Sequence, residues 1–273
     1  MRRKVGGRDR RSTVSHVARS CYIRPTMSDT APRQLAIFDV DGTLLDNMEI
    51  EDACYSAALR EVLELPSLDT DWTHYEHVSD AAIAVEAHRR QHGFAPSAAQ
   101  LDATSARFVR LLAEAHAAAT GVIRARNGAA QLFEALARHG WAVAIATGAW
   151  RRASELKMSA GGLRYVGVPM ATSEDGPARA AIVSAARVRA ERLHGVERFD
   201  RVVSIGDGLW DVLAARDLGL PFVGAGGGGR ARRLRAVGVG VILEDFADIG
   251  ATVAALETAT VPPQTTATNG DSS

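Results

Sequence analysis

The chain has 273 residues, of which 47% are apolar, enough to bury a sizeable core in one large domain or two modest ones. Its 32 basic and 32 acidic residues balance overall, but residues 1–26 hold eight of the basic and one of the acidic residues. The remaining 24 basic and 31 acidic residues leave a net charge of −7, which argues against a nucleic-acid partner. No run approaches the roughly 20 apolar residues of a membrane span.

Residues 1–30 form a basic leader before the first apolar run. The leader has no apolar h-region, so it is not a secretory signal, although its Arg and Ser content is compatible with an organelle transit peptide. Met27 offers a simpler interpretation, because a chain that starts there has a short lead into the first strand. We therefore expect a disordered extension at 1–30. Two cysteines, Cys21 and Cys54, are too few for a disulfide framework, and a cytoplasmic protein is expected.

The first strong element is an apolar run at residues 35–38, which ends in Asp39-Val40-Asp41-Gly42-Thr43. Side chains at i and i+2 of a strand point to the same face, so Asp39 and Asp41 are expected side by side. Open parallel sheets bind their ligands at this carboxyl end of the strands. Because two adjacent carboxylates repel each other, they need a cation between them, or one of them must hold a proton.

Two other interpretations of this acidic pair are weaker. Asp-Gly is a common turn dipeptide, but the full Asp-x-Asp-Gly-Thr pattern directly behind a buried strand favours a site over a plain turn. A calcium-binding loop requires a glutamate at its twelfth position, and that position, counted from Asp39, is Ile50. The pair therefore predicts a reactive site.

From Met48 to about Arg124 the chain is rich in Ala, Glu, Arg and Leu, with apolar residues at helical spacing. Breaks at 65–67 and 93–96 divide this block into about four helices without a convincing strand. Because residues 47–124 follow the acidic turn directly, we expect a helical cap over the strand ends. The segment 72–80 is unusually polar and aromatic, so His74 and Tyr75 are candidates for substrate contact. A solvated helix N-terminus is the equal alternative.

From residue 125 onward, strands and helices alternate. Helices are expected at 129–139, 150–160, 177–193, 211–218, 230–237 and 246–257, and strands at 141–146, 166–171, 201–205, 220–223 and 240–243. This alternation predicts a parallel sheet covered on both faces, with right-handed crossovers. The expected fold class is α/β, with a Rossmann-like core at 31–46 and 125–258, a helical cap inserted at 47–124, and a disordered tail at 259–273.

Polar groups follow three of the expected core strands. The first strand ends in Asp39 and Asp41, the second in Thr147-Gly148, and a later one in Asp207, with Asp211 four residues on. The later signals are weak alone, because Thr-Gly is usually a helix N-cap and Gly-Asp-Gly is usually a turn. Since each lies at the carboxyl end of a strand, together they fit one site.

On these residues the chain resembles the haloacid dehalogenase superfamily, in its phosphatase branch with an inserted helical cap, similar to phosphoglycolate phosphatases. The matching residues are 39–43, 147–148 and 206–211, of which the first group is highly specific. The resemblance covers about residues 34–245. It implies a hydrolase that cleaves a small phosphorylated metabolite with Mg²⁺ through an aspartyl-phosphate intermediate.

The resemblance implies a role for each of the four aspartates. Asp39 would be the nucleophile that attacks phosphorus, and Asp41 would protonate the leaving alkoxide and then deprotonate water. Mg²⁺ would lie between Asp39, the backbone carbonyl of Asp41, Asp207 and water. Asp211 would orient the metal's water shell or a basic residue. The implied metal set is therefore Asp39, Asp41, Asp207 and Asp211.

The resemblance also implies a phosphate-binding set. Thr147 and the amides around it would hold the non-transferred phosphate oxygens, with Thr43 and Gly148 also in contact. The family uses a basic residue here, most often lysine, and this sequence departs from it, because its single lysine beyond the leader is Lys157. Lys157 is expected inside a helix and directed elsewhere. Arg179, which opens the long helix before the Asp207 strand, is therefore the expected phosphate ligand, with Lys157 as the alternative.

A glycine run at 224–229 fits the GxGxxG pattern, and Glu244 lies about 20 residues beyond it, as a dinucleotide site requires. The strand before this run comes late in the chain, and a run of glycines satisfies the pattern trivially. We therefore expect a flexible loop.

Other activities share the expected core. A phosphomutase of the β-phosphoglucomutase type is the main alternative, and a non-enzymatic receiver module, in which a phospho-aspartate is a signal, is disfavoured by the cap and by Asp41. The presence of Asp41 argues against the dehalogenase branch, and a cap without lysine argues against a Schiff-base phosphonate hydrolase. Several cap arginines make an anionic substrate such as phosphoglycolate conceivable: Arg89, Arg90, Arg107 and Arg110.

Overall fold

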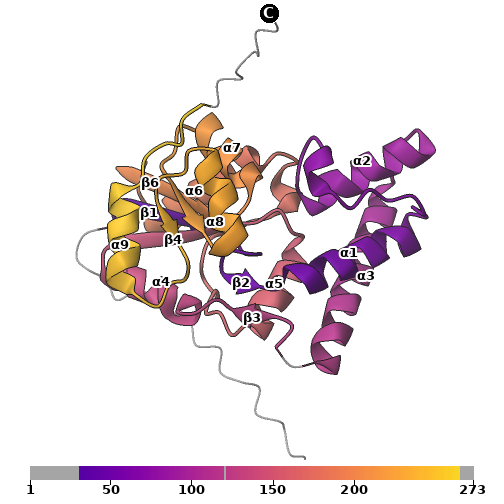
Figure 1. Ribbon diagram of the computed structural model, residues 1–273, viewed down its shortest axis with the longest axis horizontal. Helices are drawn as coiled ribbons and strands as arrows, with labels where there is room; N and C mark the ends of the chain where they lie inside the picture. Colours follow the sequence, from indigo (N-terminus) through magenta and orange to yellow (C-terminus); the bar gives the residue numbers. More distant parts are fainter. Residues whose placement is uncertain (1–30, 120, 265–273) are drawn as a thin grey trace, which may run out of the picture.

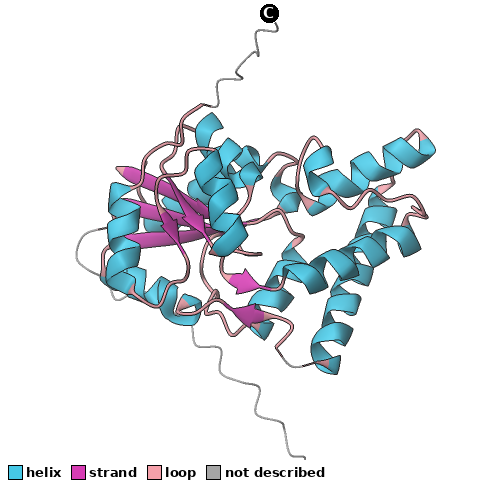
Figure 2. Ribbon diagram, in the orientation of Figure 1, coloured by secondary structure: helices cyan, strands magenta, loops and turns pink. Residues whose placement is uncertain are grey.

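The computed structural model describes residues 31–119 and 121–264. The expected extension at 1–30 and the end of the expected tail, residues 265–273, lie outside the described residues. A six-stranded parallel sheet with helices on both faces lies beside a separate group of helices (Figures 1 and 2). The α/β fold class expected from the sequence is therefore confirmed. None of the helices in the described ranges is both long and apolar enough to cross a membrane.

The sheet has the strand order β5-β4-β1-β6-β7-β8, and all neighbouring strands are parallel. Its strands are β1 (Gln34–Phe38), β4 (Trp141–Ala146), β5 (Met170–Ala171), β6 (Arg201–Gly206), β7 (Phe222–Ala225) and β8 (Ile242–Leu243). The strand order reverses at β1, which pairs with β4 on one side and with β6 on the other. In open parallel sheets, such a reversal leaves a crevice at the carboxyl ends of the strands.

Helices cover both faces of the sheet, which explains why β4, and β1 after Gln34, are continuously apolar instead of alternating. One face packs against α4 (Ala129–Arg138), α5 (Arg151–Ala160) and α9 (Ile249–Thr258). The other packs against α6 (Arg179–His194), α7 (Leu209–Asp217) and α8 (Gly228–Ala236). A short 3₁₀ turn, η2 (Ser173–Asp175), connects β5 to α6.

The cap helices are α1 (Met48–Val62), α2 (Asp80–His92) and α3 (Ala98–Ala118), with the 3₁₀ turn η1 (Trp72–His74) between the first two. They lie beside the sheet and cover neither of its faces (Figure 1). Local signals define their ends, because Gly93 closes α2 in the left-handed conformation and Ser97 opens α3 with a capping box.

The cap has a hydrophobic core of its own. Tyr55, Leu59 and Phe108 form its centre, and the cluster continues onto Trp150 and Ala153 at the start of α5. The cap therefore packs against the core through α5.

Two short strands connect the cap to the core, and the sequence did not predict them. β2 (Leu45–Asp46) and β3 (Arg124–Ala125) pair antiparallel where the chain enters and leaves the cap. An ion pair between Arg124 Nη2 and Asp46 Oδ2, 2.8 Å apart, joins them. A strand of two residues carries too little periodicity to be recognised from sequence. We call this pair of strands the hinge ribbon.

Candidate active site

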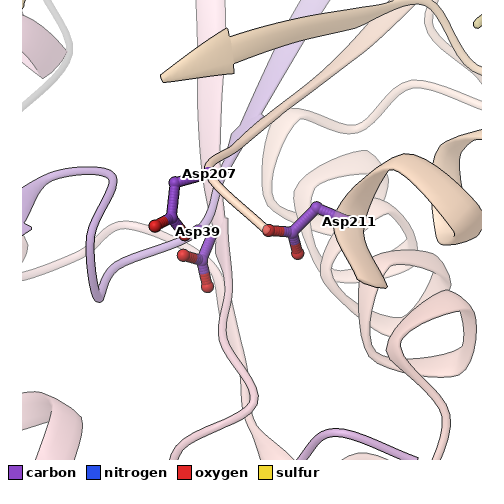
Figure 3. Close-up of side chains that lie close together, drawn as sticks. All are labelled: Asp39, Asp207 and Asp211. Atoms are coloured by element: carbon purple, nitrogen blue, oxygen red, sulfur yellow. The ribbon is translucent and has the colours of Figure 1, made fainter. Parts of the chain in front are cut away.

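Three buried carboxylates converge at the carboxyl edge of the sheet (Figure 3). Asp39 follows β1, Asp207 follows β6, and Asp211 lies in the first turn of α7. One oxygen atom from each lies within 4.8 Å of the other two. We call these three residues the aspartate cluster. Their convergence follows from the parallel sheet, because neighbouring strands end at the same edge.

Two glycines make room for the aspartate cluster. Gly42 has φ +77°, and a Cβ atom there would lie 2.1 Å from Asp207 Oδ2. A Cβ atom on Gly206 would lie 2.4 Å from Asp211 Oδ2. Only glycine permits so close an approach of backbone to carboxylate, and it also accepts the left-handed conformation at position 42.

Burial and mutual repulsion make the aspartate cluster hard to charge. Burial, together with the charge of Asp211, raises the pKa of Asp39 well above its usual range, against the opposing effect of Arg179. Burial likewise raises the pKa of Asp207 to about 7 and raises that of Asp211. A divalent cation favours the charged forms and would lower all three pKa values.

Two arginines place positive charge against the aspartate cluster. Arg179, the first residue of α6, has Nη1 3.3 Å from Asp39 Oδ1 and Nε 3.3 Å from Asp211 Oδ1. Arg230, in the first turn of α8, has Nε 2.9 Å from Asp207 Oδ2. The aspartate cluster therefore has two guanidinium groups against its three carboxyl groups.

The aspartate cluster fits a magnesium ion. The Oδ1 atom of Asp207 is buried and accepts no hydrogen bond from a described residue. Buried carboxylate oxygens almost always have a hydrogen-bond partner or a bound cation, so this oxygen is a candidate metal ligand. A free carboxylate oxygen beside two further carboxylates is the oxygen-only donor set that Mg²⁺ prefers.

Asp41 points to a different group of side chains. Its Oδ2 accepts a hydrogen bond from Lys157 Nζ at 2.6 Å, and its Oδ1 accepts one from Asn47 Nδ2 at 2.7 Å. Lys157 Nζ also donates to Glu51 of α1 and is fully buried. We call Asp41, Glu51 and Lys157 the lysine cluster. The expectation that Lys157 is directed elsewhere was wrong, because α5 presents it to the site.

The lysine cluster separates the charges of its two acids. Burial would raise the pKa of Asp41, but the Lys157 ammonium and the hydrogen bonds around the carboxylate hold that pKa below its usual range. Burial and the nearby charge of Asp41 raise the pKa of Glu51 well above its usual range. Burial would also lower the pKa of Lys157, but the two carboxylates raise it instead.

The expected phosphate-binding residues lie around the aspartate cluster. Thr43 donates a hydrogen bond to Asp39 Oδ2 at 3.1 Å. Thr147 is buried directly after β4. A Cβ atom on Gly148 would lie 2.8 Å from Arg179 Nη2, so the glycine makes room for the guanidinium. The structure therefore brings the four expected phosphate-binding residues to the same edge of the sheet as Asp39. These residues are Thr43, Thr147, Gly148 and Arg179.

A cavity of about 80 Å³ lies between the cap and the core loops. Core residues that line it include Asp39, Asp41, Thr147, Gly148 and Arg179. Cap residues that line it include Glu51, Asp52, Tyr55, Trp72 and Asp80. The helical block inserted after the acidic turn therefore closes over the carboxylates.

His74 and Tyr75 do not line this cavity. His74 is exposed and has Nδ1 2.8 Å from Asp69 Oδ2. Tyr75 is buried within the cap, and its hydroxyl donates to the Asp69 carbonyl at 2.8 Å. Trp72, at the start of the same 3₁₀ turn, lines the cavity instead. Of the turn residues, Trp72 therefore lines the cavity whereas His74 and Tyr75 do not, because a turn of three residues places neighbouring side chains on different sides.

Arg230 is a site residue that sequence reasoning missed. It follows β7 and the glycine run, and α8 begins within that run at Gly228. Its Nη1 also donates to the Gly42 carbonyl at 3.2 Å, so it contacts both the first loop and Asp207. The sequence could have indicated Arg230, because this arginine follows a core strand at the edge of the sheet where the other site residues lie.

Known proteins resemble this chain in family and in fold. The family described as haloacid dehalogenase-like hydrolase matches residues 34–219. Among curated proteins, none matches the sequence. A hydrolase from Pseudomonas syringae shares 24% identity and a TM-score of 0.60, with 82% of this chain and 99% of that chain covered.

Two further solved structures have the same architecture. CbbY from Rhodobacter sphaeroides, in complex with phosphate, shares 23% identity and a TM-score of 0.55, covering 84% of this chain and 100% of its own. A protein described as a predicted phosphoglycolate phosphatase from Haemophilus somnus shares 19% identity and a TM-score of 0.53, covering 80% and 97%. At these identities the likeness shows the fold alone.

Proposed function

Because the chain belongs to the haloacid dehalogenase-like hydrolases, we propose that it is a Mg²⁺-dependent phosphatase that hydrolyses a small phosphate monoester. The observation that carries this proposal is the aspartate cluster, buried at one sheet edge with Arg179 against Asp39. Phosphoryl transfer depends mainly on positioning and on stabilisation of negative charge. Carboxylates that hold a cation, beside a guanidinium group, supply both.

In this proposal Asp39 is the nucleophile that forms an aspartyl-phosphate. Oδ2 of Asp39 accepts a hydrogen bond from Thr43 and Oδ1 accepts one from Arg179, and we assign the attack to Oδ1, on the side of the proposed phosphate ligand. Asp39, Asp207 and the backbone carbonyl of Asp41 would hold Mg²⁺, which would supply positive charge beside the nucleophile and the phosphate. Asp211 would orient the Arg179 guanidinium through the ion pair between Asp211 Oδ1 and Arg179 Nε.

Arg179 and the backbone after Thr147 would bind the phosphate. A guanidinium group binds phosphate through a pair of parallel hydrogen bonds, and Arg179 is held at both Nη1 and Nε by carboxylates of the site. Gly148 lies directly against it. The cap over these groups would exclude water from the intermediate and restrict the size of the substrate.

Asp41 would act as the general acid and the general base, and Lys157 would favour its role as the base. A charged Asp41 is the form that accepts a proton from the water attacking the aspartyl-phosphate. Lys157, 2.6 Å from Oδ2, stabilises this form. Glu51, on the other side of the same ammonium, is the group with the raised pKa. The lysine cluster would therefore support hydrolysis of the intermediate most strongly.

The test is release of inorganic phosphate from p-nitrophenyl phosphate and from a panel of phosphorylated metabolites, with Mg²⁺ and with a chelator. We expect release that depends on Mg²⁺. Asp39→Asn should lower kcat by at least about a thousandfold while the thermal unfolding temperature stays close to that of the wild type.

Asp102→Asn is the matched control, because Asp102 is exposed in α3, away from the cavity, and its substitution should leave kcat unchanged. Full activity in Asp39→Asn would rule out the proposed nucleophile. A product that keeps its phosphate, formed from a sugar phosphate primed with a bisphosphate, would show a phosphomutase instead.

A further inference from the structure

The two sides of the cavity differ in charge. The core side carries Arg179 together with the proposed metal site. Among the described residues that line the cavity, the cap contributes three acidic side chains, Glu51, Asp52 and Asp80, and no basic one. The phosphate of a substrate belongs on the core side, so its alcohol part must face the acidic cap.

The cap arginines lie away from this cavity. Arg107 forms an ion pair within the cap, and Arg90 lies over a tyrosine ring of the cap. Arg89 lines a separate cleft between α2 and η2, and Arg110 is exposed. A carboxylate on the alcohol part, as in phosphoglycolate, would therefore meet negative charge without a cation from the cap.

Of the three cap carboxylates, Asp52 is the one with a carboxylate oxygen most available to a ligand. Glu51 is bound by Lys157, and Asp80 Oδ2 accepts a hydrogen bond from the Trp150 amide at 2.8 Å. Asp52 Oδ1 accepts one from the Trp72 indole at 2.8 Å, while Oδ2 receives none from a described residue. Burial raises the pKa of Asp52, a tendency that a cationic ligand would reverse.

Three aromatic rings line the same cavity as Asp52. Trp72 and Tyr55 meet edge to face, with ring centroids 5.6 Å apart, and the hydrogen bond to Asp52 fixes the Trp72 indole. Trp210, in the first turn of α7, lines the cavity from the core side. Aromatic rings together with a carboxylate are the surroundings that bind an ammonium group.

We propose that the substrate is a small amino-alcohol phosphate whose ammonium group binds beside Asp52, among Trp72, Tyr55 and Trp210. This inference rests on the proposed phosphatase function. The cavity of about 80 Å³ is far below the roughly 300 Å³ of sites for drug-sized ligands, so only a few atoms separate the ammonium from the phosphate. The positive charge of the ammonium group offsets the negative charge of the cap residues that line the cavity.

The reaction balances without a further reactant beyond water. The ester P–O bond breaks as an Asp39 oxygen bonds to phosphorus, and the alkoxide takes a proton from Asp41, which yields the free amino alcohol. Water then attacks the phosphorus of the aspartyl-phosphate, and the bond between phosphorus and the Asp39 oxygen breaks. Asp41 takes the proton of the water, which it supplies to the alkoxide in the next turnover, and inorganic phosphate and the Asp39 carboxylate are released.

The test compares kcat/KM, with Mg²⁺, for three esters of similar size: phosphoethanolamine, ethyl phosphate and phosphoglycolate, which carry a cationic, a neutral and an anionic group. We expect phosphoethanolamine to exceed ethyl phosphate by at least about tenfold, and phosphoglycolate to be the poorest. A preference for phosphoglycolate or for ethyl phosphate overturns the inference but leaves the phosphatase standing. Failure to release phosphate from any ester, p-nitrophenyl phosphate included, would overturn the proposed function itself.

Asp52→Asn tests the residue, because asparagine keeps an acceptor for the Trp72 indole and loses the charge. It should lower the ratio of kcat/KM between phosphoethanolamine and ethyl phosphate at least about tenfold, mainly through KM for the amine. Glu49→Gln, which removes an exposed charge of the same helix, should leave that ratio unchanged. If Asp52→Asn leaves the ratio unchanged, or if both variants lower it equally, the assigned ammonium site is wrong.

Discussion

The aspartate cluster and the lysine cluster begin two residues apart in the chain, and their charges are balanced in opposite ways. Core elements alone build the first, in which carboxylates outnumber cations and the pKa of Asp39 is raised by burial and by Asp211. Core and cap share the second, in which Lys157 opposes the effect of burial and holds the pKa of Asp41 below its usual range.

The difference teaches how neighbouring aspartates acquire separate tasks. Environments that push two pKa values apart assign different roles to chemically identical groups. Asp39 belongs to a proposed site for a metal cation, whereas Asp41 is paired with the Lys157 ammonium. Because Glu51 comes from the cap, the surroundings of Asp41 depend on how the cap packs on the core, whereas core residues alone form the aspartate cluster.

Removing the internal cation should have the largest effect. Lys157→Met leaves two buried carboxylates without their partner, so the free energy of unfolding at pH 7 should fall by about 3–5 kcal/mol. The loss should shrink as the pH falls, because the unpaired carboxylates then take up protons. Urea denaturation at pH 5 and pH 7 measures both effects.

Arg152→Met, on the exposed side of the same helix, is the control for this change and should cost less than about 0.5 kcal/mol. If Lys157→Met were equally mild, the lysine would not be the group that balances Asp41 and Glu51, and the contrast between the two clusters would fail.

Adding an external cation should act on the aspartate cluster alone. At a free Mg²⁺ concentration of 100 times Kd, the free energy of unfolding should rise by about 2.7 kcal/mol. Asp207→Asn should abolish most of this gain, whereas Lys157→Met should retain it. Thermal unfolding with and without Mg²⁺ measures the increment. A gain that survives in Asp207→Asn would place the metal elsewhere.

Arg179→Ala should weaken phosphate binding without removing the nucleophile. We expect KM to rise roughly ten- to hundredfold, with a smaller change in kcat, and inorganic phosphate to inhibit less strongly. Arg179→Lys should recover part of the loss, because it restores the charge but not the paired hydrogen bonds. Unchanged kinetic constants in Arg179→Ala would transfer the phosphate-binding role to Lys157.

Asp80 should give the smallest effect and the opposite sign to Asp41. Burial raises its pKa to about 7, so between about pH 4 and pH 7 the folded protein binds a proton that the unfolded chain has released. Stability from this group is therefore lost as the pH rises through that window. Asp80→Asn, which keeps an acceptor for the Trp150 amide, should recover ~1 kcal/mol at pH 8 relative to pH 5. Parallel pH profiles of the unfolding free energy for wild type and variant would contradict this.

Sequence alone was sufficient where the determinants were local or periodic. Apolar runs and helical spacing predicted the α/β core, and the rule that parallel strands end at one edge brought Asp39, Asp207 and Asp211 together. The roles assigned to these residues rest on the resemblance of their motifs to the family and stay predictions.

Features that depend on distant packing could not be read from sequence. Lys157 meets partners 116 and 106 residues away, so its direction depends on how the cap docks on α5. The same docking places Trp72 at the cavity and leaves His74 exposed. Helical periodicity shows which face of a helix is buried, but it does not show which element covers that face.

The hinge ribbon has a consequence for how such a protein diversifies. Because β2 and β3 pair side by side, with Leu45 opposite Ala125, the whole inserted block begins and ends at one point of the core. A two-residue turn between these strands would close them as an ordinary hairpin. Replacing the insert with another helical block would therefore change the residues that line the cavity from the cap side, while the register of the parallel sheet would stay the same.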